Sequence, residues 1–251
     1  MAEFTVSIAN IPIRIKPLLP EIKSYFTEYL CEEEERFTVE TAEDDLEYER
    51  EYSDRIYAEE DRQKWPPRYL ETLALLRKIA NQVVEYDTIL FHGAVVAFEG
   101  KAYLFAAPSG TGKTTHIRLW LGTLPGAYVL NGDKPFLQIG KDGSVLACGT
   151  PWRGKERYGR NEILPLEGIC LLERDTYNHI QAITPKESVN RLLRQTYIPP
   201  RSGAMIKTIS ILDSISKGVR LYRLGCNMQP EAAQVSINAM VRGISEGRDR
   251  E

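Results

Sequence analysis

The stretch Ala107-Pro-Ser-Gly-Thr-Gly-Lys-Thr114 stands between an apolar run and a helical pattern. It resembles the phosphate-loop pattern G-x-x-x-x-G-K-[ST], with alanine at the position of the first glycine. The run Lys101–Ala107 precedes it as a predicted strand, and residues 115–121 follow as a predicted helix. Because this order of strand, loop and helix is what phosphate binding needs, we expect a phosphate-binding loop here.

Each position of the loop has an expected task. Glycines 110 and 112 would let backbone N–H groups converge on phosphate oxygens, where a side chain would block the approach. Lys113 would reach the β and γ phosphates of ATP, and the hydroxyl of Thr114 would bind Mg²⁺. The alternative is a glycine-rich turn before a surface helix. The expected nucleotide-binding residues are Ser109, Gly110, Thr111, Gly112, Lys113, Thr114 and Thr115.

Magnesium needs a carboxylate in addition to one threonine, and Asp133 is the candidate. Residues 127–131 form the next predicted strand, and Asn131-Gly-Asp133 follows at its carboxyl end. Ligands gather at that edge of a sheet, so Asp133 should lie beside the loop. The alternative is an Asn-Gly turn whose aspartate only binds its own backbone.

His92 is placed by strand register. If Gly93–Phe98 and Lys101–Ala107 form a hairpin with Glu99 and Gly100 in the turn, residue 98 faces 101 and His92 faces Ala107. The imidazole would then act as a base, contact the γ phosphate or pair with Asp133. A buried structural histidine is the alternative. The predicted catalytic residues are His92, Asp133 and Lys113.

The segment Gly149–Asn161 carries four cations, one acid, three glycines and two aromatics in thirteen positions, and it looks too polar for a core. It is expected to be a mobile flap that folds over the triphosphate. Arg153, Lys155 and Arg157 would neutralise charge during transfer. A solvated surface loop is the alternative.

Composition bounds the class of protein. The chain has 251 residues, 32 basic and 35 acidic side chains and 43% apolar residues, which suits a globular domain with a small appendage. Residues 31–62 hold fifteen acids against four arginines, which is typical of a solvated face or a docking surface for a basic partner.

The remaining cations are scattered without interleaved aromatics, so we expect no nucleic-acid partner. No apolar run is long enough to span a membrane, and we expect no membrane partner and a cytoplasmic protein.

The chain divides into three expected parts. Residues 1–67 would be a small, β-rich α+β subdomain, with strands within 4–15 and 36–41. Residues 68–245 would be the catalytic domain, opening with a helix over 68–85. This domain would have an α/β core with a mixed, mainly parallel sheet. Capping signals predict further helices from Pro185 and Pro230, and 246–251 would be a polar tail.

Together, the pair His92-Gly93, the loop with Thr115 and the Asn-Gly-Asp sequence resemble the HPr kinase/phosphorylase family, over about residues 90–175. The loop also looks like that of ATP-dependent phosphoenolpyruvate carboxykinase, a relative in fold. The resemblance implies a P-loop kinase core that transfers the γ phosphate of ATP to a serine hydroxyl. It implies that His92 and Asp133 work at the reacting phosphate. Family members carry two adjacent aspartates where this chain has Gly132-Asp133, so Asp133 must serve as metal ligand and base, or His92 takes the second role.

The expected function is therefore an ATP- and Mg²⁺-dependent serine kinase, a phosphotransferase whose acceptor is a small protein or peptide. A carboxykinase-like enzyme acting on a small molecule and a non-catalytic ATP-binding regulatory module are the alternatives. The acceptor, phosphorolysis and a homo-oligomeric state are left open by the sequence.

Overall fold

The computed structural model describes residues 3–56 and 65–243, which fall into two compact units, Met1–Tyr86 and Asp87–Glu251. The expected boundary after residue 67 lies elsewhere in the structure. Helix α2 (Pro67–Val83) packs against α1 (Glu43–Ile56) and therefore belongs to the first unit. The short 3-10 helix η3 (Val84–Tyr86) ends that unit. The expected polar tail at 246–251 lies outside the described residues.

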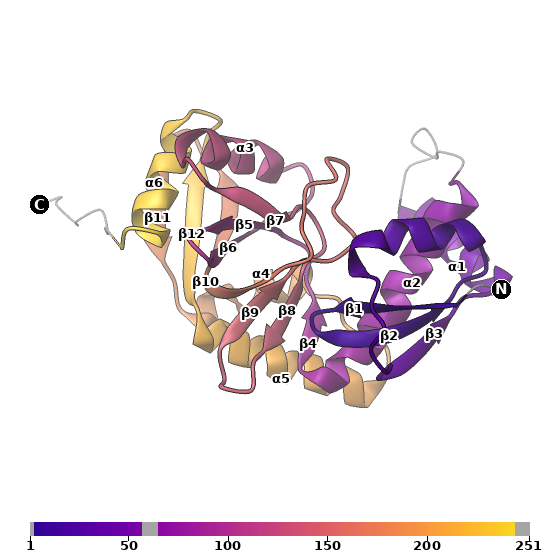
Figure 1. The fold of residues 1–251 in the computed structure, drawn as a ribbon. Helices are drawn as coiled ribbons and strands as arrows, with labels where there is room; N and C mark the ends of the chain where they lie inside the picture. Colours follow the sequence, from indigo (N-terminus) through magenta and orange to yellow (C-terminus); the bar gives the residue numbers. More distant parts are fainter. Residues whose placement is uncertain (1–2, 57–64, 244–251) are drawn as a thin grey trace, which may run out of the picture. The chain divides into compact units, whose positions relative to one another are not determined.

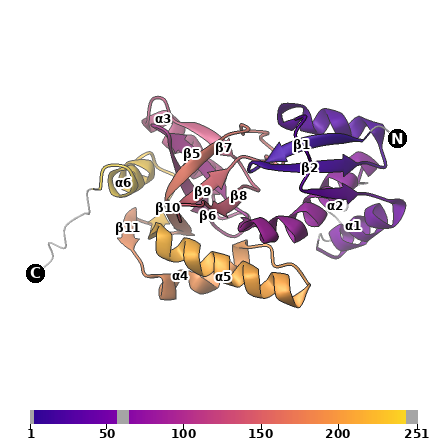
Figure 2. The ribbon, with the colours of Figure 1, turned by 60° about the horizontal axis from the view of Figure 1, so that its bottom comes forward.

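The first unit contains a three-stranded sheet made of β1 (Phe4–Ile8), β2 (Ile11–Lys16) and β3 (Phe37–Glu40). Strands β1 and β2 form an antiparallel hairpin, and β3 pairs with β2 in parallel, which confirms the strands predicted within 4–15 and 36–41. The 3-10 helix η1 (Pro20–Tyr29) connects β2 to β3. Helices α1 and α2 lie together on one side of this small sheet (Figure 2).

Part of the acidic run is not solvated. Helix α1 lies within it, and Glu49 is only 5% exposed. The guanidinium of Arg77 pairs with Glu49 at 2.5 Å and with Asp45 at 3.2 Å, while the ammonium of Lys78 pairs with Asp45 at 2.6 Å. Basic residues of α2 thus balance the buried Glu49 and the half-buried Asp45 of α1, so the acidic run is not solvated over its whole length. Residues 57–62 of the run lie outside the described residues.

The second unit is built on one mixed sheet (Figure 1). Its main path has the order β4-β8-β9-β10-β6-β5-β7, and β12 continues from β10 to β11. Among the strands of this unit within residues 87–243, β10 with β6 and β10 with β12 pair in parallel, and the other pairs are antiparallel. The mixed sheet is confirmed, whereas the expectation of a mainly parallel sheet is wrong. The strands are β4 (Thr88–Leu90), β5 (Ala94–Phe98), β6 (Lys101–Ala106), β7 (Tyr128–Asn131), β8 (Phe136–Ile139), β9 (Val145–Cys148), β10 (Ile163–Arg174), β11 (His179–Ala182) and β12 (Arg220–Cys226).

The hairpin of β5 and β6 has the predicted register. Phe98 pairs with Lys101, and Ala94 pairs with Phe105. If this register is continued by two residues, His92 stands opposite Ala107, as predicted. The turn residues Glu99 and Gly100 have φ values of 49° and 72°, as a two-residue hairpin turn requires.

Helices cover both faces of this sheet (Figures 1 and 2). On one face lie α3 (Lys113–Thr123) and α6 (Glu231–Met240), and on the other α4 (Pro185–Gln195) and α5 (Ser202–Gly218). Tyr103 and Phe105, which alternate along β6 toward the first face, pack with Trp120 of α3 in a core shared with α6. The capping box of Thr184 and Glu187 opens α4 as predicted. The packing of Trp120 against β6 holds α3 against the sheet, next to the loop that follows β6.

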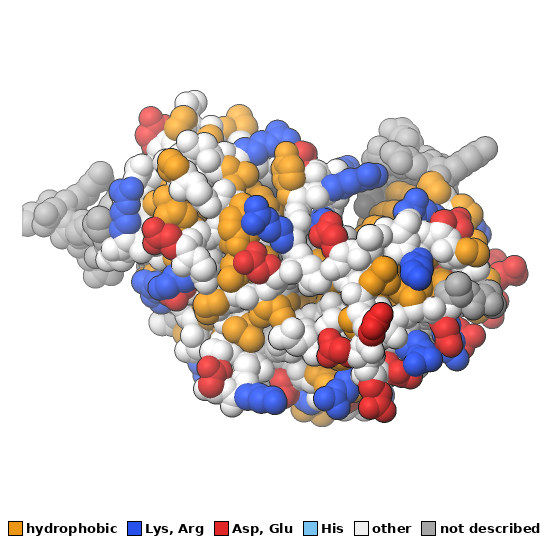
Figure 3. Space-filling model, in the orientation of Figure 1, with side chains coloured by type: hydrophobic (Ala, Val, Ile, Leu, Met, Phe, Trp, Pro, Cys, Tyr) orange, Lys and Arg blue, Asp and Glu red, His pale blue; other side chains and the backbone are white. Residues whose placement is uncertain are grey.

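No helix among the described residues is long and apolar enough to cross a membrane. On the face drawn in Figure 3, Lys and Arg side chains are interspersed with Asp and Glu side chains.

Candidate functional site

The ends of several strands bring the predicted site residues to one edge of the sheet. Strands β6 and β7 run in the same direction because each is antiparallel to β5, which lies between them. The loop after β6, the residues after β7 and those before β5 therefore meet at this edge. Strand β10 is parallel to β6 and ends there too, at Arg174. The predicted proximity of the loop, His92 and Asp133 follows directly from this topology.

The loop between β6 and α3 has the backbone of an open turn. Gly110 and Gly112 adopt φ values of 78° and 118°, a region that L side chains rarely enter. A Cβ atom built on either glycine would meet no atom within 4 Å, so these positions face open space. Helix α3 begins at Lys113, and the N–H groups of its first turn have no intrahelical acceptor. The side chains of Ser109 and Thr114 are exposed, and those of Thr111 and Thr115 are half-buried.

Lys113 and Asp133 share one neighbour, the Nε2 atom of His92. The Lys113 Nζ atom lies 3.4 Å from Nε2, and Asp133 Oδ1 lies 3.3 Å from it. Lys113 also donates to the carbonyl of Ala107 at 3.2 Å. The imidazole and the carboxylate are each about one-third exposed, so the cluster is open to a ligand.

Nε2 can serve only one of these two partners at a time. With a hydrogen, it donates to Asp133; without one, it accepts from Lys113. Burial opposes ionisation of Asp133, but the hydrogen bond from His92 and the charge of Lys134 outweigh it and lower the pKa of Asp133 to about 2. Burial lowers the pKa of Lys113, although the charge of Asp133 opposes this shift. A carboxylate at Asp133 favours the form in which Nε2–H points at Asp133, which leaves the ammonium of Lys113 available.

Asn131 fixes the turn that carries Asp133. Its Oδ1 accepts from the backbone N–H of Asp133 at 3.0 Å and of Lys134 at 2.8 Å, while its Nδ2 donates to the carbonyl and hydroxyl of Thr150. The predicted turn hydrogen bonds therefore exist, but the asparagine makes them, and the Asp133 carboxylate stays directed at His92 and Lys134. Gly93 N–H donates to the Asp133 carbonyl, which locks β5 to this turn.

Arg174 is a residue that sequence reasoning missed. It is the last residue of β10, and its guanidinium donates to the carbonyls of Gly110 at 2.5 Å and Thr111 at 3.3 Å. These bonds hold the two peptide units of the loop in a fixed orientation. Nothing in the local sequence reveals that β10 lies next to β6, so only the sheet order could have indicated this arginine.

The helix after the loop is anchored in the core. Trp120 Nε1 donates to Ser236 Oγ of α6 at 2.7 Å, and His116 Nε2 lies 3.0 Å from the same oxygen. The serine hydrogen is directed at carbonyls of its own helix, so His116 donates through Nε2–H. Burial lowers the pKa of His116 to about 4, and the imidazole is neutral at pH 7. His116 is thus a core residue that positions α3.

The segment Gly149–Asn161 is only partly the exposed flap that was expected. Thr150 and Trp152 are buried. The carbonyl of Thr150 accepts a hydrogen bond from Asn131, and its hydroxyl donates to the carbonyl of Lys134. Arg153 is half-buried, and its side chain lies against Gly159, where a Cβ would come within 2.9 Å of it. Residues 154–158, which include Lys155 and Arg157, are exposed.

The exposed tip nevertheless reaches the site. A Cβ on Gly154 would lie 2.9 Å from Asp133 Cβ, so the tip lies directly against this aspartate. Glu156 pairs with Arg118 of α3 at 3.0 Å. The positions on either side of Gly154 are therefore close to the cluster of His92, Lys113 and Asp133.

The donor set fits a nucleotide with magnesium. Phosphate oxygens are bound by the N–H groups at a helix N-terminus and by a lysine, and both are present here. The open space at the two glycines leaves room for the phosphates. Among the described residues there is no group of three or more His, Cys, Asp or Glu that could hold a metal ion. Magnesium bound to phosphates needs only one or two protein oxygens, because phosphate and water complete its coordination. Thr114 and Asp133 are the residues that could hold it.

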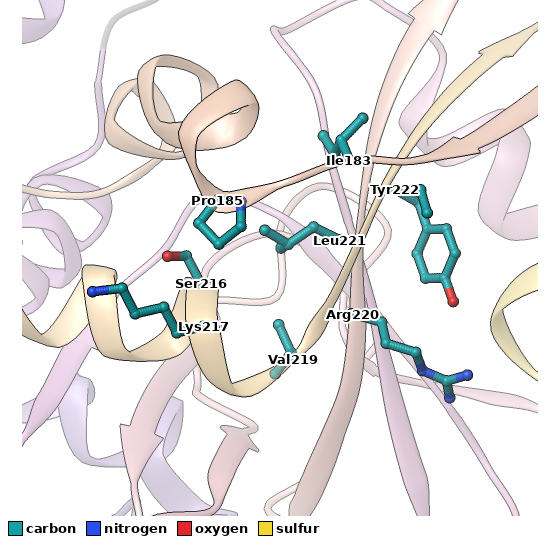
Figure 4. Close-up of a pocket in the computed structure, with 9 residues that line it drawn as sticks. Ile183, Pro185, Ser216, Lys217, Val219, Arg220, Leu221 and Tyr222 are labelled. Atoms are coloured by element: carbon teal, nitrogen blue, oxygen red, sulfur yellow. The ribbon is translucent and has the colours of Figure 1, made fainter.

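A cavity of about 260 Å³ lies away from this site. Pro185, Ser216 and Leu221 are among the residues that line it (Figure 4). It is located at the start of β12, whereas the loop, Asp133 and Arg174 lie at the opposite ends of the strands. The residues that line the cavity do not include any of the loop 107–115, so the cavity is separate from the candidate site.

No protein-family model matches the chain. No curated protein matches it either. Among solved structures, the Hpr(Ser) kinase/phosphatase from Coxiella burnetii aligns with 61% of this chain and 88% of its own, at 10% sequence identity and a TM-score of 0.35. A TM-score this low carries no argument about function.

Proposed function

We propose that the second unit binds ATP with Mg²⁺ at residues 107–115 and transfers the γ phosphate to a hydroxyl, as a P-loop kinase of the HPr-kinase type does. The observation that carries the proposal is the shared contact of Lys113 and Asp133 with His92 Nε2, beside a loop whose two glycines have positive φ. A phosphate-binding cation and a base are thereby held next to each other, as phosphoryl transfer requires.

Each residue of the site has a separate role in the proposed reaction. The loop amides and Lys113 hold the phosphates, and Arg174 keeps the loop carbonyls turned toward itself. Thr114 and Asp133 would hold magnesium, which when bound neutralises charge on the phosphates. Asp133, oriented by His92, accepts the proton of the attacking hydroxyl as that oxygen takes the γ-phosphoryl group and ADP is released. Lys155 and Arg157, on the exposed tip of the segment, would neutralise charge on the transferred group.

The acceptor is proposed to be a serine of a small protein or peptide, as in the family that the motifs resemble. The one-third exposure of the His92 and Asp133 side chains supports an acceptor of this size, because a hydroxyl on the surface of another chain can reach them. A carboxykinase-like reaction is less well supported, because Gly132 supplies no second carboxylate beside Asp133.

Incubation with ATP, Mg²⁺ and serine-containing peptides encoded beside its gene tests this function by mass spectrometry. The proposal predicts a mass gain of one phosphate that is lost in Lys113→Ala and retained in Lys217→Ala, an exposed lysine on α5. ATP binding without transfer to any peptide would instead identify a non-catalytic nucleotide-binding module. Phosphate gain that persists in Lys113→Ala would contradict the assigned site.

A further inference from the structure

An exposed aromatic ring lies at the same sheet edge, beyond the loop. Tyr177 is in the turn between β10 and β11 and is 64% exposed, and it is the most exposed aromatic side chain among the described residues. Tyr177 follows Arg174 by three residues, and the guanidinium of Arg174 touches the loop at Gly110. The ring is therefore tied to the phosphate-binding loop through the end of one strand.

The ring of Tyr177 packs against a second aromatic ring. Tyr177 and His179 have ring centroids 4.8 Å apart with an interplanar angle of 32°. His179 in turn lies directly on Gly225 of β12, where a Cβ would come within 2.2 Å of the imidazole Cε1. Because only glycine leaves this room, the backbone of β12 supports His179 and His179 supports Tyr177. The outer face of Tyr177 is left to solvent.

Hydrogen bonds make the surrounding turns rigid. Asn178 Nδ2 donates to Asn227 Oδ1 at 3.1 Å, and the backbone N–H of Asn227 donates to Asn178 Oδ1 at 2.9 Å. Asn227 Nδ2 also donates to the Thr176 carbonyl at 3.1 Å. Next to this pair lies Met228, which is 76% exposed. Tyr177 and Met228 are thus both displayed to solvent by turns that are bonded to each other.

The order of strands gives a direction to a bound nucleotide. Along this edge, Asp133 follows β7, His92 precedes β5, the loop follows β6, Arg174 ends β10, and Tyr177 precedes β11 beyond β12. Three strand spacings of about 4.8 Å separate β6 from β11, a span that an extended nucleotide can cross with its phosphates and nucleoside together. A triphosphate on the loop, with its γ phosphate toward Asp133, has its other end directed toward Tyr177.

We infer that Tyr177, backed by His179, is the stacking platform for the base of a purine nucleotide. This inference rests on the proposed function, since it takes the phosphates to lie on the loop. A purine ring has a planar π face of the kind that stacks on tyrosine, and such stacking is worth about tenfold in affinity or more.

The experiment is calorimetric titration of ATP and of inorganic tripolyphosphate, both with Mg²⁺, into the full chain and three variants. Tyr177→Ala is expected to weaken ATP binding about tenfold and to leave tripolyphosphate binding unchanged, because tripolyphosphate has no base. Tyr177→Phe should bind ATP as the parent chain does. Tyr52→Ala, which removes an exposed tyrosine of the first unit, is the matched control and should change neither ligand.

The outcomes separate this inference from the function on which it rests. Unchanged ATP binding in Tyr177→Ala, together with binding that depends on Lys113, would overturn the platform and leave the kinase proposal intact. Equal weakening of ATP and tripolyphosphate would also overturn the platform, because it would indicate a structural role for Tyr177. No binding of either ligand to the parent chain would overturn the phosphate loop and the platform with it.

Discussion

His92 Nε2 lies 3.3 Å from Asp133 Oδ1, although 40 residues and a helix separate the two in the chain. The contact exists because β7 pairs antiparallel with β5, so the residue before one strand meets the residue after the other. The backbone N–H of Gly93 donates to the Asp133 carbonyl at 3.0 Å and closes the same junction. Imidazole and carboxylate are consequently held by main-chain geometry.

Replacement of Asp133 by Asn is expected to slow phosphate transfer about 10²- to 10⁴-fold, because the amide cannot accept the hydroxyl proton. ATP affinity should change only a few-fold, since the loop and Lys113 remain. The pKa of Asp133 is about 2, so the carboxylate is ionised throughout pH 5–8 and the fold loss should be the same at both ends of that range. Single-turnover rates measured across this range check the prediction. Asp213→Asn, on the exposed surface of α5, serves as the control and should leave the rate unchanged.

Arg174→Met is expected to weaken ATP binding about fivefold to tenfold, because the carbonyls of Gly110 and Thr111 lose a charged donor worth roughly 1–1.5 kcal/mol. Arg174→Lys should recover part of the affinity, since an ammonium can still donate to one carbonyl. The two dissociation constants, measured by calorimetry, decide the point. Affinity equal to that of the parent chain in Arg174→Met would show that the loop keeps its shape without this arginine.

Gly112→Ala is expected to reduce ATP affinity even though its Cβ would meet no atom within 4 Å. The cost is conformational, because a φ of 118° strains an alanine by about 1–3 kcal/mol. Relief of that strain would turn the amides of the loop away from the phosphates. Gly203→Ala on α5, where a Cβ also meets nothing but φ is not positive, is the matched control and should bind normally.

The free energy of unfolding of the second unit should fall as pH decreases, because the buried His116 resists protonation in the folded state. Its pKa is about 4 when folded and about 6.5 when unfolded, so the unfolded chain takes up the proton first. The stabilisation is complete above about pH 6.5 and is lost as pH falls toward 4, by about 2 kcal/mol between pH 7.5 and pH 5. Urea unfolding at these two pH values gives the difference. A shallower pH dependence is expected for His116→Gln, and identical slopes in the two chains would contradict the assignment.

Local patterns were sufficient to predict the core of the site. The loop followed by a helix at Lys113, the register of β5 and β6, and the turn at Asn131–Asp133 all involve residues close together in the chain. Short-range hydrogen bonding and strand alternation determine such features, so one sequence reveals them.

Features that depend on distant pairing were missed. The parallel pairing of β10 with β6 places Arg174 on the loop, yet more than 50 residues separate the paired positions. The sheet was expected to be mainly parallel because strands alternate with helices in the sequence, whereas β8 and β9 return as an antiparallel hairpin. Similarly, the acids of α1 look solvated until Arg77 of another helix is seen to balance them. These contacts depend on tertiary packing, which composition does not report.

Calorimetric titration of ATP with Mg²⁺ into the parent chain and into Lys113→Ala tests the central claim most directly. We predict one site per chain in the parent and at least a tenfold weaker site in the variant, because the proposed function makes the ammonium of Lys113 the phosphate-binding cation of the loop. Equal affinity in the two proteins, or no binding to the parent chain, would contradict a nucleotide site at Gly110–Lys113.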